Sequence, residues 1–417
     1  MGNRIAPRPE VLSVADKAVP AWADGLDLRD FLGREPRLSD LSTPVLVLDR
    51  SAMSRNIAEF ARWTAAHHVD LEPHGKTTMA PALWQEQLDV GATAITVANL
   101  PQLQVAVAAG VTDVHVANAI ADPAGLRWLG AKLDADPALN VTLWADGIGT
   151  VDVLERGLAG GTRQPTVLVE LGGPGGRTGA RSVDDAYAVG ERIAESDRLR
   201  LGGVTGYEGA FAHDSSAESL ATVDGYLTRL RALHNRLVPL YPDGRIVISA
   251  GGSAYFDRVA AMLAGLENAR VVIRSGAYII HDDGFYRGIT PSGRETDAPS
   301  LGSAMTVWAR VISRPEPGLA LLDVGRRDVS FDEGLPQPQV AATDLGEKPR
   351  PIVGEVSAVN DQHAFLRLSE HDPVRVGDVV RLGLSHPCTV MDKWRTIPVL
   401  ADQGDNPRVV DMISTYF

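Results

Sequence analysis

The sequence predicts a parallel (β/α)8 TIM-type barrel followed by a C-terminal, mainly antiparallel β domain. Short, almost wholly apolar runs rich in β-branched residues alternate with longer stretches of helical spacing. Strands that are buried on both faces of a parallel sheet have this composition. After about residue 300 the helical spacing fades, and β-rich runs separated by Pro, Gly and Asp replace it. That change of pattern indicates a second domain.

Eight strand-like runs and seven helix-like stretches make up the alternating part. We expect strands at residues 69–72, 94–98, 113–116, 141–145, 166–171, 203–207, 246–250 and 271–274. We expect helices between them at residues 79–88, 101–109, 123–133, 150–158, 183–196, 216–237 and 254–264. Strict alternation indicates parallel βαβ units. Eight such units favour a closed barrel over the rival arrangement, an open doubly wound sheet.

The flanking regions complete the predicted architecture. A strand at residues 44–48 precedes the barrel and leads into an amphipathic helix at 51–66. The later β-rich runs lie at residues 304–312, 320–324, 352–358, 364–368, 379–384 and 396–401. We predict an N-terminal segment, 1–48, that joins the β domain, a barrel over 49–290 and a β domain over 300–417. The polar segment 325–348, which contains Pro and Gly, is interpreted as a long surface loop.

Composition excludes several classes of protein. The 417 residues are 44% apolar and 22% charged, with a formal net charge of −13, so the chain lacks the basic footprint of a nucleic-acid binder. No apolar run reaches membrane-spanning length, and the first 40 residues lack the apolar core of a secretory signal. The single cysteine fits a reducing compartment. We therefore expect a cytoplasmic protein with neither nucleic-acid nor membrane partners.

A lysine follows the first predicted barrel strand, in the segment Pro-His-Gly-Lys-Thr at 73–77. Barrel enzymes place their chemistry in the loops after the strands. Lys76 is therefore expected to face the barrel mouth, where desolvation lowers the pKa of an ammonium group. Such a lysine is suited to forming an imine, and His74 could orient it. The structural alternatives are a solvated loop lysine and a packing histidine.

Glycine-rich loops follow the seventh and eighth predicted strands. The first contains Gly251, Gly252 and Ser253, and the second contains Ser275, Gly276, Ala277 and Tyr278. In barrels these two loops commonly hold phosphate through backbone N–H groups. Neither a Walker A motif nor a dinucleotide-binding glycine motif is present. The sequence therefore indicates a phosphate site, but not a nucleoside triphosphate or dinucleotide site.

Two other strand ends carry side chains suited to a ligand. The glycine-rich turn at 172–179 lets the backbone approach a ligand closely, and Arg177 within it could direct a permanent cation into the mouth. Tyr207, after the sixth strand, could stack on a ring or hydrogen-bond to it. The structural alternatives are a surface turn for Arg177 and packing for Tyr207.

A soft pair of metal ligands lies far downstream. His386 and Cys388 are two residues apart, and zinc is the metal that this pair suits best. Two protein ligands are too few for a closed structural zinc site, which would leave positions for water or substrate. The alternative is a buried cysteine beside an ordinary histidine.

Together these motifs resemble the fold-type III pyridoxal-phosphate enzymes of the alanine racemase class, in particular the D-serine dehydratase and D-threonine aldolase group. The resemblance extends from residue 43 to about residue 400. It implies that Lys76 carries pyridoxal 5′-phosphate as a Schiff base, that Arg177 and Tyr207 lie near its ring, and that the two glycine loops hold its phosphate. It also implies a homodimer and a metal on His386 and Cys388: zinc, or else manganese or another divalent ion.

The resemblance implies an activity as well. It is a pyridoxal-phosphate- and zinc-dependent β-elimination from a small D-3-hydroxy amino acid, such as D-serine or D-threonine, to a 2-oxo acid and ammonia. Aldolases of this group more usually have His-x-Asp at the metal position, so Cys388 favours dehydration. The alternatives are a metal-dependent D-threonine aldolase that gives glycine and an aldehyde, an amino-acid racemase, and a non-catalytic protein that binds the cofactor.

Overall fold

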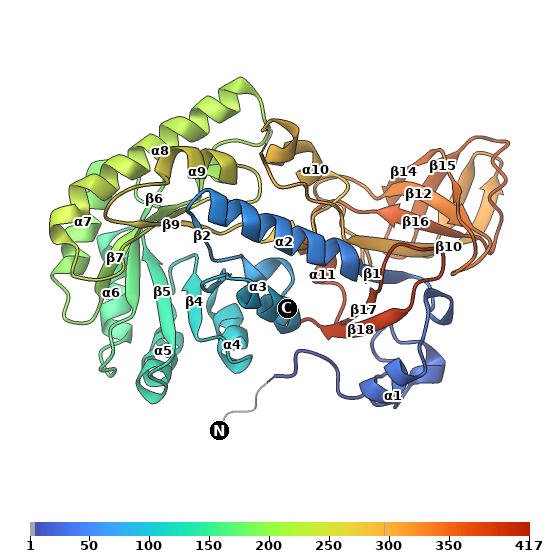
Figure 1. The fold of residues 1–417 in the computed structure, drawn as a ribbon, viewed down its shortest axis with the longest axis horizontal. Coiled ribbons are helices and arrows are strands. Elements are labelled where there is room, and N and C mark those ends of the chain that lie inside the picture. Colours follow the sequence, from blue (N-terminus) through green and yellow to red (C-terminus); the bar gives the residue numbers. More distant parts are fainter. Residues whose placement is uncertain (1–4, 296) are drawn as a thin grey trace.

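The chain folds into a parallel barrel and, beside it, a ten-stranded sheet (Figure 1). The computed structural model describes residues 5–295 and 297–417. In Figure 1 the barrel and its helices occupy the left half and the β domain the right half, with the blue helix α2 (Arg50–Ala66) running across the middle. The predicted fold class, a parallel barrel followed by a mainly antiparallel β domain, is confirmed.

Eight parallel strands build the barrel in the order β2-β9-β8-β7-β6-β5-β4-β3. They are β2 (Asp70–Leu71), β3 (Ile95–Val97), β4 (Asp113–Val116), β5 (Asn140–Ala145), β6 (Thr166–Leu171), β7 (Arg200–Gly206), β8 (Val247–Ala250) and β9 (Arg270–Ile273). Beyond β2, the backbone N–H of Thr96 donates to the Pro73 carbonyl at 2.9 Å. This bond and a parallel bridge between His74 and Thr96 close the barrel.

Helices follow the barrel strands and cover them from outside. They are α3 (Pro81–Asp89), α4 (Leu100–Ala108), α5 (Pro123–Ala135), α6 (Ile148–Gly157), α7 (Val183–Ala194), α8 (Ala217–Leu237) and α9 (Phe256–Leu263). Several begin at a side chain that caps the first turn, because its oxygen accepts a backbone N–H that has no partner within the helix. The caps are Asn99 in α4, Asp122 in α5, Ser182 in α7 and Ser216 in α8.

The second sheet has the order β13-β12-β16-β10-β1-β17-β18, and β11, β15 and β14 extend it from β10. Its strands are β1 (Val45–Asp49), β10 (Met305–Glu316), β11 (Leu319–Leu322), β12 (Gln337–Ala342), β13 (Arg350–Pro351), β14 (Gly354–Val359), β15 (Ala364–Leu368), β16 (Val379–Gly383), β17 (Thr396–Leu400) and β18 (Val409–Ser414). The N-terminal strand β1 thus lies inside this sheet, antiparallel to β10 and parallel to β17. Three short helices complete the fold: α1 (Leu28–Gly33), α10 (Phe285–Ile289) and α11 (Cys388–Met391).

One prediction about the β domain is wrong. The segment 325–348 was predicted to be a long surface loop, but it contains β12, which pairs with both β13 and β16. Pro338 and two glutamines hide the strand in the sequence, because they interrupt its apolar alternation. A register shift between Pro338 and Val340 accommodates the proline.

Helix α2 connects the two parts of the molecule. Its cap Asp49 is the last residue of β1, and the Asp49 side chain accepts the backbone N–H of Ala52 at 3.0 Å. Further along α2, the ring of Phe60 stacks on Tyr278 with centroids 4.4 Å apart and meets Phe256 edge-on at 4.9 Å. This aromatic cluster joins α2 to α9 and to the turn that follows β9.

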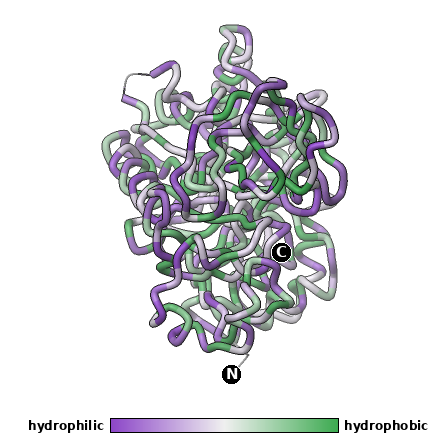
Figure 2. The backbone as a smooth tube through the Cα atoms, turned by 90° about the vertical axis from the view of Figure 1, so that its right-hand side faces the viewer, coloured by the Kyte–Doolittle hydropathy of each residue, from purple (hydrophilic) through white to green (hydrophobic). Residues whose placement is uncertain are grey.

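Apolar and hydrophilic stretches alternate along the described part of the backbone, as Figure 2 shows. The buried apolar side chains form one large core cluster, and Ala117, Trp144 and Leu168 form a small second one. Within residues 5–295 and 297–417, none of the helices combines the length and the apolar character required to cross a membrane.

The aromatic cluster gives a stability prediction. Phe60 is fully buried, so Phe60→Ala should create a cavity and lower the free energy of unfolding by about 3–5 kcal/mol. Denaturant unfolding of the variant measures this value. The control Phe417→Ala removes a ring that is 55% exposed and should change stability by less than about 0.5 kcal/mol. Equal effects of the two substitutions would contradict the assigned role of the cluster.

Candidate functional site

A cavity of about 540 Å³ lies where the carboxyl ends of the barrel strands meet the β domain. That volume suits a small-molecule ligand. Its walls come from the ends of the barrel strands, from α10, and from two loops of the β domain around residues 333 and 386. The residues that were expected to form a site and that line this cavity are His74, Lys76, Arg177, Tyr207, Gly252, Ser253, Gly276, Ala277, His386 and Cys388.

Lys76 is the one lysine that lines the cavity, out of five in the sequence, all of which the structure describes. It lies in a short 3-10 turn, Gly75–Thr77, directly after the extension of β2. Burial lowers the pKa of Lys76 below its ordinary value. Arg177 and Arg274 lower it further, while the Cys388 thiolate opposes the shift. Lys76 therefore has the environment that a nucleophilic amine requires.

His74 presents an unsatisfied nitrogen beside this lysine. Its Nδ1 atom is buried and has no hydrogen-bond partner among the described residues. Burial lowers the pKa of His74 well below its ordinary value, and the neighbouring Lys76 and Arg274 charges add to the shift. The imidazole is therefore neutral, and it has a free position for a hydrogen bond from a ligand or a water molecule.

The two glycine loops are hydrogen-bonded to each other and to Glu208. The buried Glu208 carboxylate accepts the backbone N–H groups of Gly251 at 3.0 Å and Gly252 at 2.8 Å. The Ser275 hydroxyl donates to the Gly252 carbonyl at 3.0 Å, and Ser253 Oγ accepts the N–H of Ala277 at 3.3 Å. The carboxylate and these bonds hold the two loops in a fixed arrangement at one end of the cavity.

Three residues of the predicted phosphate loops lie behind the cavity wall. Gly251 is held by Glu208, and the fully buried Ser275 supports Gly252. The Tyr278 ring packs on Phe60 of α2 instead of facing the cavity. Gly276 is required for space, because a Cβ atom there would lie 2.3 Å from the backbone oxygen of His74. The loop after β9 thus packs directly against the loop that carries Lys76.

Two permanent cations face the cavity. Arg177 lies over the ring of Tyr207, with the guanidinium carbon 5.2 Å from the ring centroid. Arg274, to which the sequence analysis gave no role, is 5% exposed and lies inside the barrel. It donates to the Gly206 carbonyl at 2.7 Å and lies 4.9 Å from the centroid of the Trp144 ring. A cavity with two such cations suits a ligand that carries phosphate and carboxylate groups.

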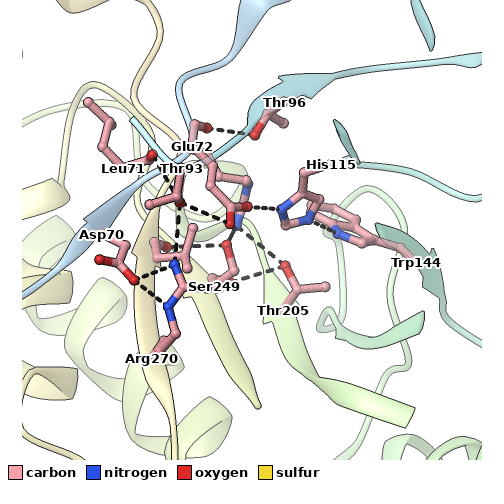
Figure 3. Close-up of polar contacts among 12 residues, drawn as sticks. Asp70, Leu71, Glu72, Thr93, Thr96, His115, Trp144, Thr205, Ser249 and Arg270 are labelled. Atoms are coloured by element: carbon pink, nitrogen blue, oxygen red, sulfur yellow. Dashed lines mark hydrogen bonds and ion pairs between the residues drawn. The ribbon is translucent and has the colours of Figure 1, made fainter. Parts of the chain in front are cut away.

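A buried chain of hydrogen bonds supports this part of the wall (Figure 3). Glu72 and His115 Nδ1 are 2.6 Å apart, and the Trp144 indole donates to His115 Nε2 at 2.7 Å. The indole needs an acceptor, so the His115 proton is on Nδ1 and points to Glu72. Burial raises the pKa of Glu72, but His115 outweighs it and the net shift is downward. An ionised Glu72 therefore fixes the orientation of Trp144 through a neutral His115.

His386 and Cys388 enter the cavity from the β domain. Burial lowers the pKa of His386, but its bonds to Cys388 and Asp332 outweigh burial and raise the value to about 9. Burial raises the pKa of the Cys388 thiol, but His386 and Lys76 outweigh it and the net shift is downward. The Cys388 sulfur lies 3.4 Å from the Thr77 hydroxyl, next to Lys76. The β domain thus brings an ionisable pair to the barrel lysine.

Asp332 completes the surroundings of the pair. It accepts from His386 Nδ1 at 2.7 Å and from the Thr389 hydroxyl at 2.8 Å. Within the described residues, three or more His, Cys, Asp and Glu side chains do not gather into a metal-holding group. Because Asp332 occupies Nδ1 of His386, Nε2 is the ring nitrogen that remains for another ligand.

Sequence reasoning missed Arg274, Trp144, Asp332 and Tyr286. Arg274 follows an apolar strand directly, which is a signal that could have identified it. Trp144 is part of a strand and reads as core, while Tyr286 and Asp332 lie in segments without a motif. Only the packing of the β domain against the barrel brings Tyr286 to the cavity and Asp332 to His386.

Comparison with known proteins agrees with this architecture. Residues 304–400 match the model of a putative serine dehydratase domain. The chain is 26% identical to D-threonine aldolase from Arthrobacter sp. over 357 residues, which cover 84% of this chain and 86% of that protein. It is 27% identical to D-threo-3-hydroxyaspartate dehydratase from Delftia sp. (strain HT23) over 308 residues, which cover 71% and 75%.

Solved structures have the same fold. D-threonine aldolase from Filomicrobium marinum superposes with a TM-score of 0.78 at 24% identity, covering 91% of this chain and 97% of that one. A metal-free D-threo-3-hydroxyaspartate dehydratase variant, with a cysteine replaced by alanine, gives 0.70 at 23% identity and covers 91% and 99%. Another variant of that dehydratase has alanine in place of a histidine two positions earlier.

Alanine racemase from Pseudomonas aeruginosa has the same architecture at a greater distance. Its TM-score is 0.57 at 16% identity, and the match covers 84% of this chain and 93% of the racemase. The aldolase and dehydratase relatives together with this shared architecture support the conclusion that the chain is a fold-type III pyridoxal-phosphate enzyme with an alanine racemase-like barrel.

Proposed function

We propose that this chain is a pyridoxal-phosphate- and zinc-dependent lyase. It would dehydrate a small D-3-hydroxy amino acid, such as D-serine or D-threonine, and release a 2-oxo acid and ammonia. The observation that carries the proposal is the meeting of two domains in one cavity. Lys76 comes from the barrel, and His386 and Cys388 come from the β domain. The 3.4 Å contact between Cys388 and Thr77 joins the two groups.

The cavity fits pyridoxal phosphate. Its lining supplies a buried lysine of lowered pKa, a wall of two close-packed glycine loops and two arginines. The unpaired Nδ1 of His74 offers one more polar contact beside the lysine. Bound cofactor would withdraw electrons from the α-carbon of an amino acid joined to it, which makes the α-proton removable.

Lys76 is the residue placed to move that proton. Its lowered pKa keeps a larger fraction of the amine neutral near pH 7, and a neutral amine accepts a proton. His74 remains neutral beside it, because its own pKa is well below the ordinary value. A neutral neighbour adds no charge to oppose protonation of the lysine.

The pair His386 and Cys388 fits a zinc ion. Thiolate and imidazole are soft ligands that zinc accepts. Asp332 occupies His386 Nδ1, which leaves Nε2 for the metal, and a carboxylate on the far nitrogen is the usual support of a zinc histidine. The dehydratase relative supports this assignment, since its altered histidine and cysteine have the same spacing. Bound zinc would act as a Lewis acid at the leaving hydroxyl group.

A second candidate is cleavage of the Cα–Cβ bond. Proteins named D-threonine aldolase are among the relatives, and one covers 84% of this chain. In that reading the same metal pair would favour loss of the hydroxyl proton, and the products would be glycine and an aldehyde. We place dehydration first because the second proposed metal ligand is a cysteine, Cys388. The dehydratase variants replace a histidine and a cysteine that have the same spacing as His386 and Cys388.

A product assay tests the proposed function. Purified protein with pyridoxal phosphate and zinc should convert D-threonine and D-serine to a 2-oxo acid and ammonia in equal amounts. Zinc removal by a chelator should abolish this activity, because two protein ligands leave the metal accessible, and added zinc should restore it. His386→Ala should lose at least roughly 100-fold in kcat/KM. The control His371→Ala changes an exposed histidine and should match the wild type.

The assay also separates the alternatives. Formation of glycine and acetaldehyde from D-threonine would show that the protein catalyses the aldolase reaction and not dehydration. Conversion of a D-amino acid to its L-form would indicate a racemase. Unchanged dehydration after metal removal would contradict the zinc role alone.

The packing of Gly276 predicts a separate effect on the cofactor. Gly276→Ala should displace the His74 carbonyl and the adjoining Lys76 turn, because its Cβ has no space. We expect pyridoxal-phosphate affinity to fall by at least roughly tenfold, or about 1.4 kcal/mol. Titration of cofactor absorbance measures it. The control Gly149→Ala meets no atom within 4 Å and should bind like the wild type; equal affinities for all three proteins would contradict the predicted coupling.

A further inference from the structure

We infer that Asp282 is a positioning residue for the metal ligand His386, an inference that rests on the proposed function. Asp282 itself lines no part of the cavity. Its carboxylate lies between the start of α10, which forms one wall of the cavity, and the loop that carries His386 and Cys388. One carboxylate oxygen binds the start of α10, and the other binds the loop of His386.

The contacts divide between the two carboxylate oxygens. Oδ1 accepts the backbone N–H groups of Gly284 at 3.1 Å, Tyr286 at 2.9 Å and Arg287 at 3.2 Å. Oδ2 accepts the backbone N–H of His386 at 2.9 Å. Asp282 is 1% exposed, so water does not easily replace these hydrogen bonds.

His386 needs such support because its backbone is in an unfavourable conformation. Its φ angle is +52°, in the left-handed region that a histidine rarely adopts. The Asp282 carboxylate holds its backbone N–H, and Asp332 holds its Nδ1 atom. These two restraints together aim Nε2 of His386, which is the nitrogen assigned to the metal.

Neighbouring bonds make the connection stiff. The Ser385 hydroxyl accepts the N–H of Phe285 at 3.0 Å and donates to the Glu333 carbonyl at 2.5 Å. The N–H of Asp283 donates to the Leu384 carbonyl at 2.9 Å. A Cβ atom at Gly284 would lie 2.6 Å from Ser385 Oγ, so the two segments are in close contact. A shift of the metal loop is therefore transmitted to α10.

This connection has a consequence for the cavity. Helix α10 brings Phe285, Tyr286 and Ile289 to the cavity wall. Asp282 therefore sets the distance between the metal ligands and the wall that a substrate side chain would contact. Asp282 therefore positions other residues, because both of its carboxylate oxygens accept hydrogen bonds from backbone N–H groups.

The substitution Asp282→Asn tests the inference. The amide presents an NH₂ group either to His386 or to α10, and in both cases N–H faces N–H. We expect the Kd for zinc of the cofactor-loaded protein to rise roughly 10- to 100-fold, the range typical of groups that orient a metal ligand. Competition with a chromophoric chelator measures it. The Kd for pyridoxal phosphate, measured separately, should stay within about threefold of the wild-type value.

Asp323→Asn is the matched control. Asp323 also accepts a backbone N–H, that of Arg310 at 2.7 Å, but its carboxylate binds Arg310 and Thr43 and not the loop of His386. This variant should bind zinc like the wild type. An unchanged zinc Kd in Asp282→Asn, or an equal loss in both variants, would overturn the inference. A wild-type protein that binds no zinc would instead overturn the metal part of the proposed function, and the inference with it.

A second measurement needs no variant. Zinc added to the wild-type, cofactor-loaded protein should slow amide hydrogen exchange at Gly284, Tyr286 and Arg287, because the carboxylate that holds their N–H groups also holds His386. The amide of Arg310, held by Asp323, should not respond. Zinc binding that leaves exchange at all of these α10 amides unchanged would contradict the coupling.

Discussion

The site depends on the backbone pairing of β1 within the C-terminal sheet. Four residue pairs join β1 to β10, and Leu48 and Asp49 pair with β17 on the other side. Since β1 leads directly into α2 and then into the first barrel strand, this pairing places the β domain over the barrel mouth. Together with the contacts that Asp282 and Thr77 make to the metal loop, it fixes His386 and Cys388 relative to Lys76. The ladder of β1 is thus the constraint on which the two-domain cavity rests.

Burial is the second general cause in the site. It lowers the pKa values of Lys76 and His74, and it also opposes ionisation of Cys388. The cavity nevertheless stabilises an ionised cysteine, because His386 and Lys76 lie close to it. The barrel thus supplies an amine of lowered pKa, and the β domain supplies a thiol of lowered pKa. One desolvated space would therefore serve both parts of the proposed function, cofactor binding and metal binding.

Much of the fold could be predicted from the sequence, because periodicity reports burial. Eight runs such as Thr166–Leu171 are mostly apolar, and all eight overlap barrel strands. Lys76 and the two glycine loops could be found because parallel strands end at the same edge of a barrel. Strand β12 could not, since Pro338 and its glutamine neighbours break the alternating pattern and only pairing with β16 makes them a strand.

The parts of the site that escaped prediction depend on contacts between distant segments. Asp332 lies 54 residues from His386, and Asp282 lies 104 residues from it. Neither has a sequence motif, because a carboxylate that binds a backbone N–H can belong to almost any local pattern. The same holds for Tyr278, whose position after a strand predicted a phosphate contact. Packing on Phe60 of α2 determines its orientation instead.

The central claim is that Lys76 carries the cofactor, and chemical labelling tests it most directly. Protein loaded with pyridoxal phosphate would be reduced with borohydride, digested and analysed by mass spectrometry. We predict a phosphopyridoxyl group on the peptide that contains Lys76, because the other lysines, Lys17, Lys132, Lys348 and Lys393, lie outside the cavity. A stoichiometric label on any of those four, or no label on Lys76, would contradict it.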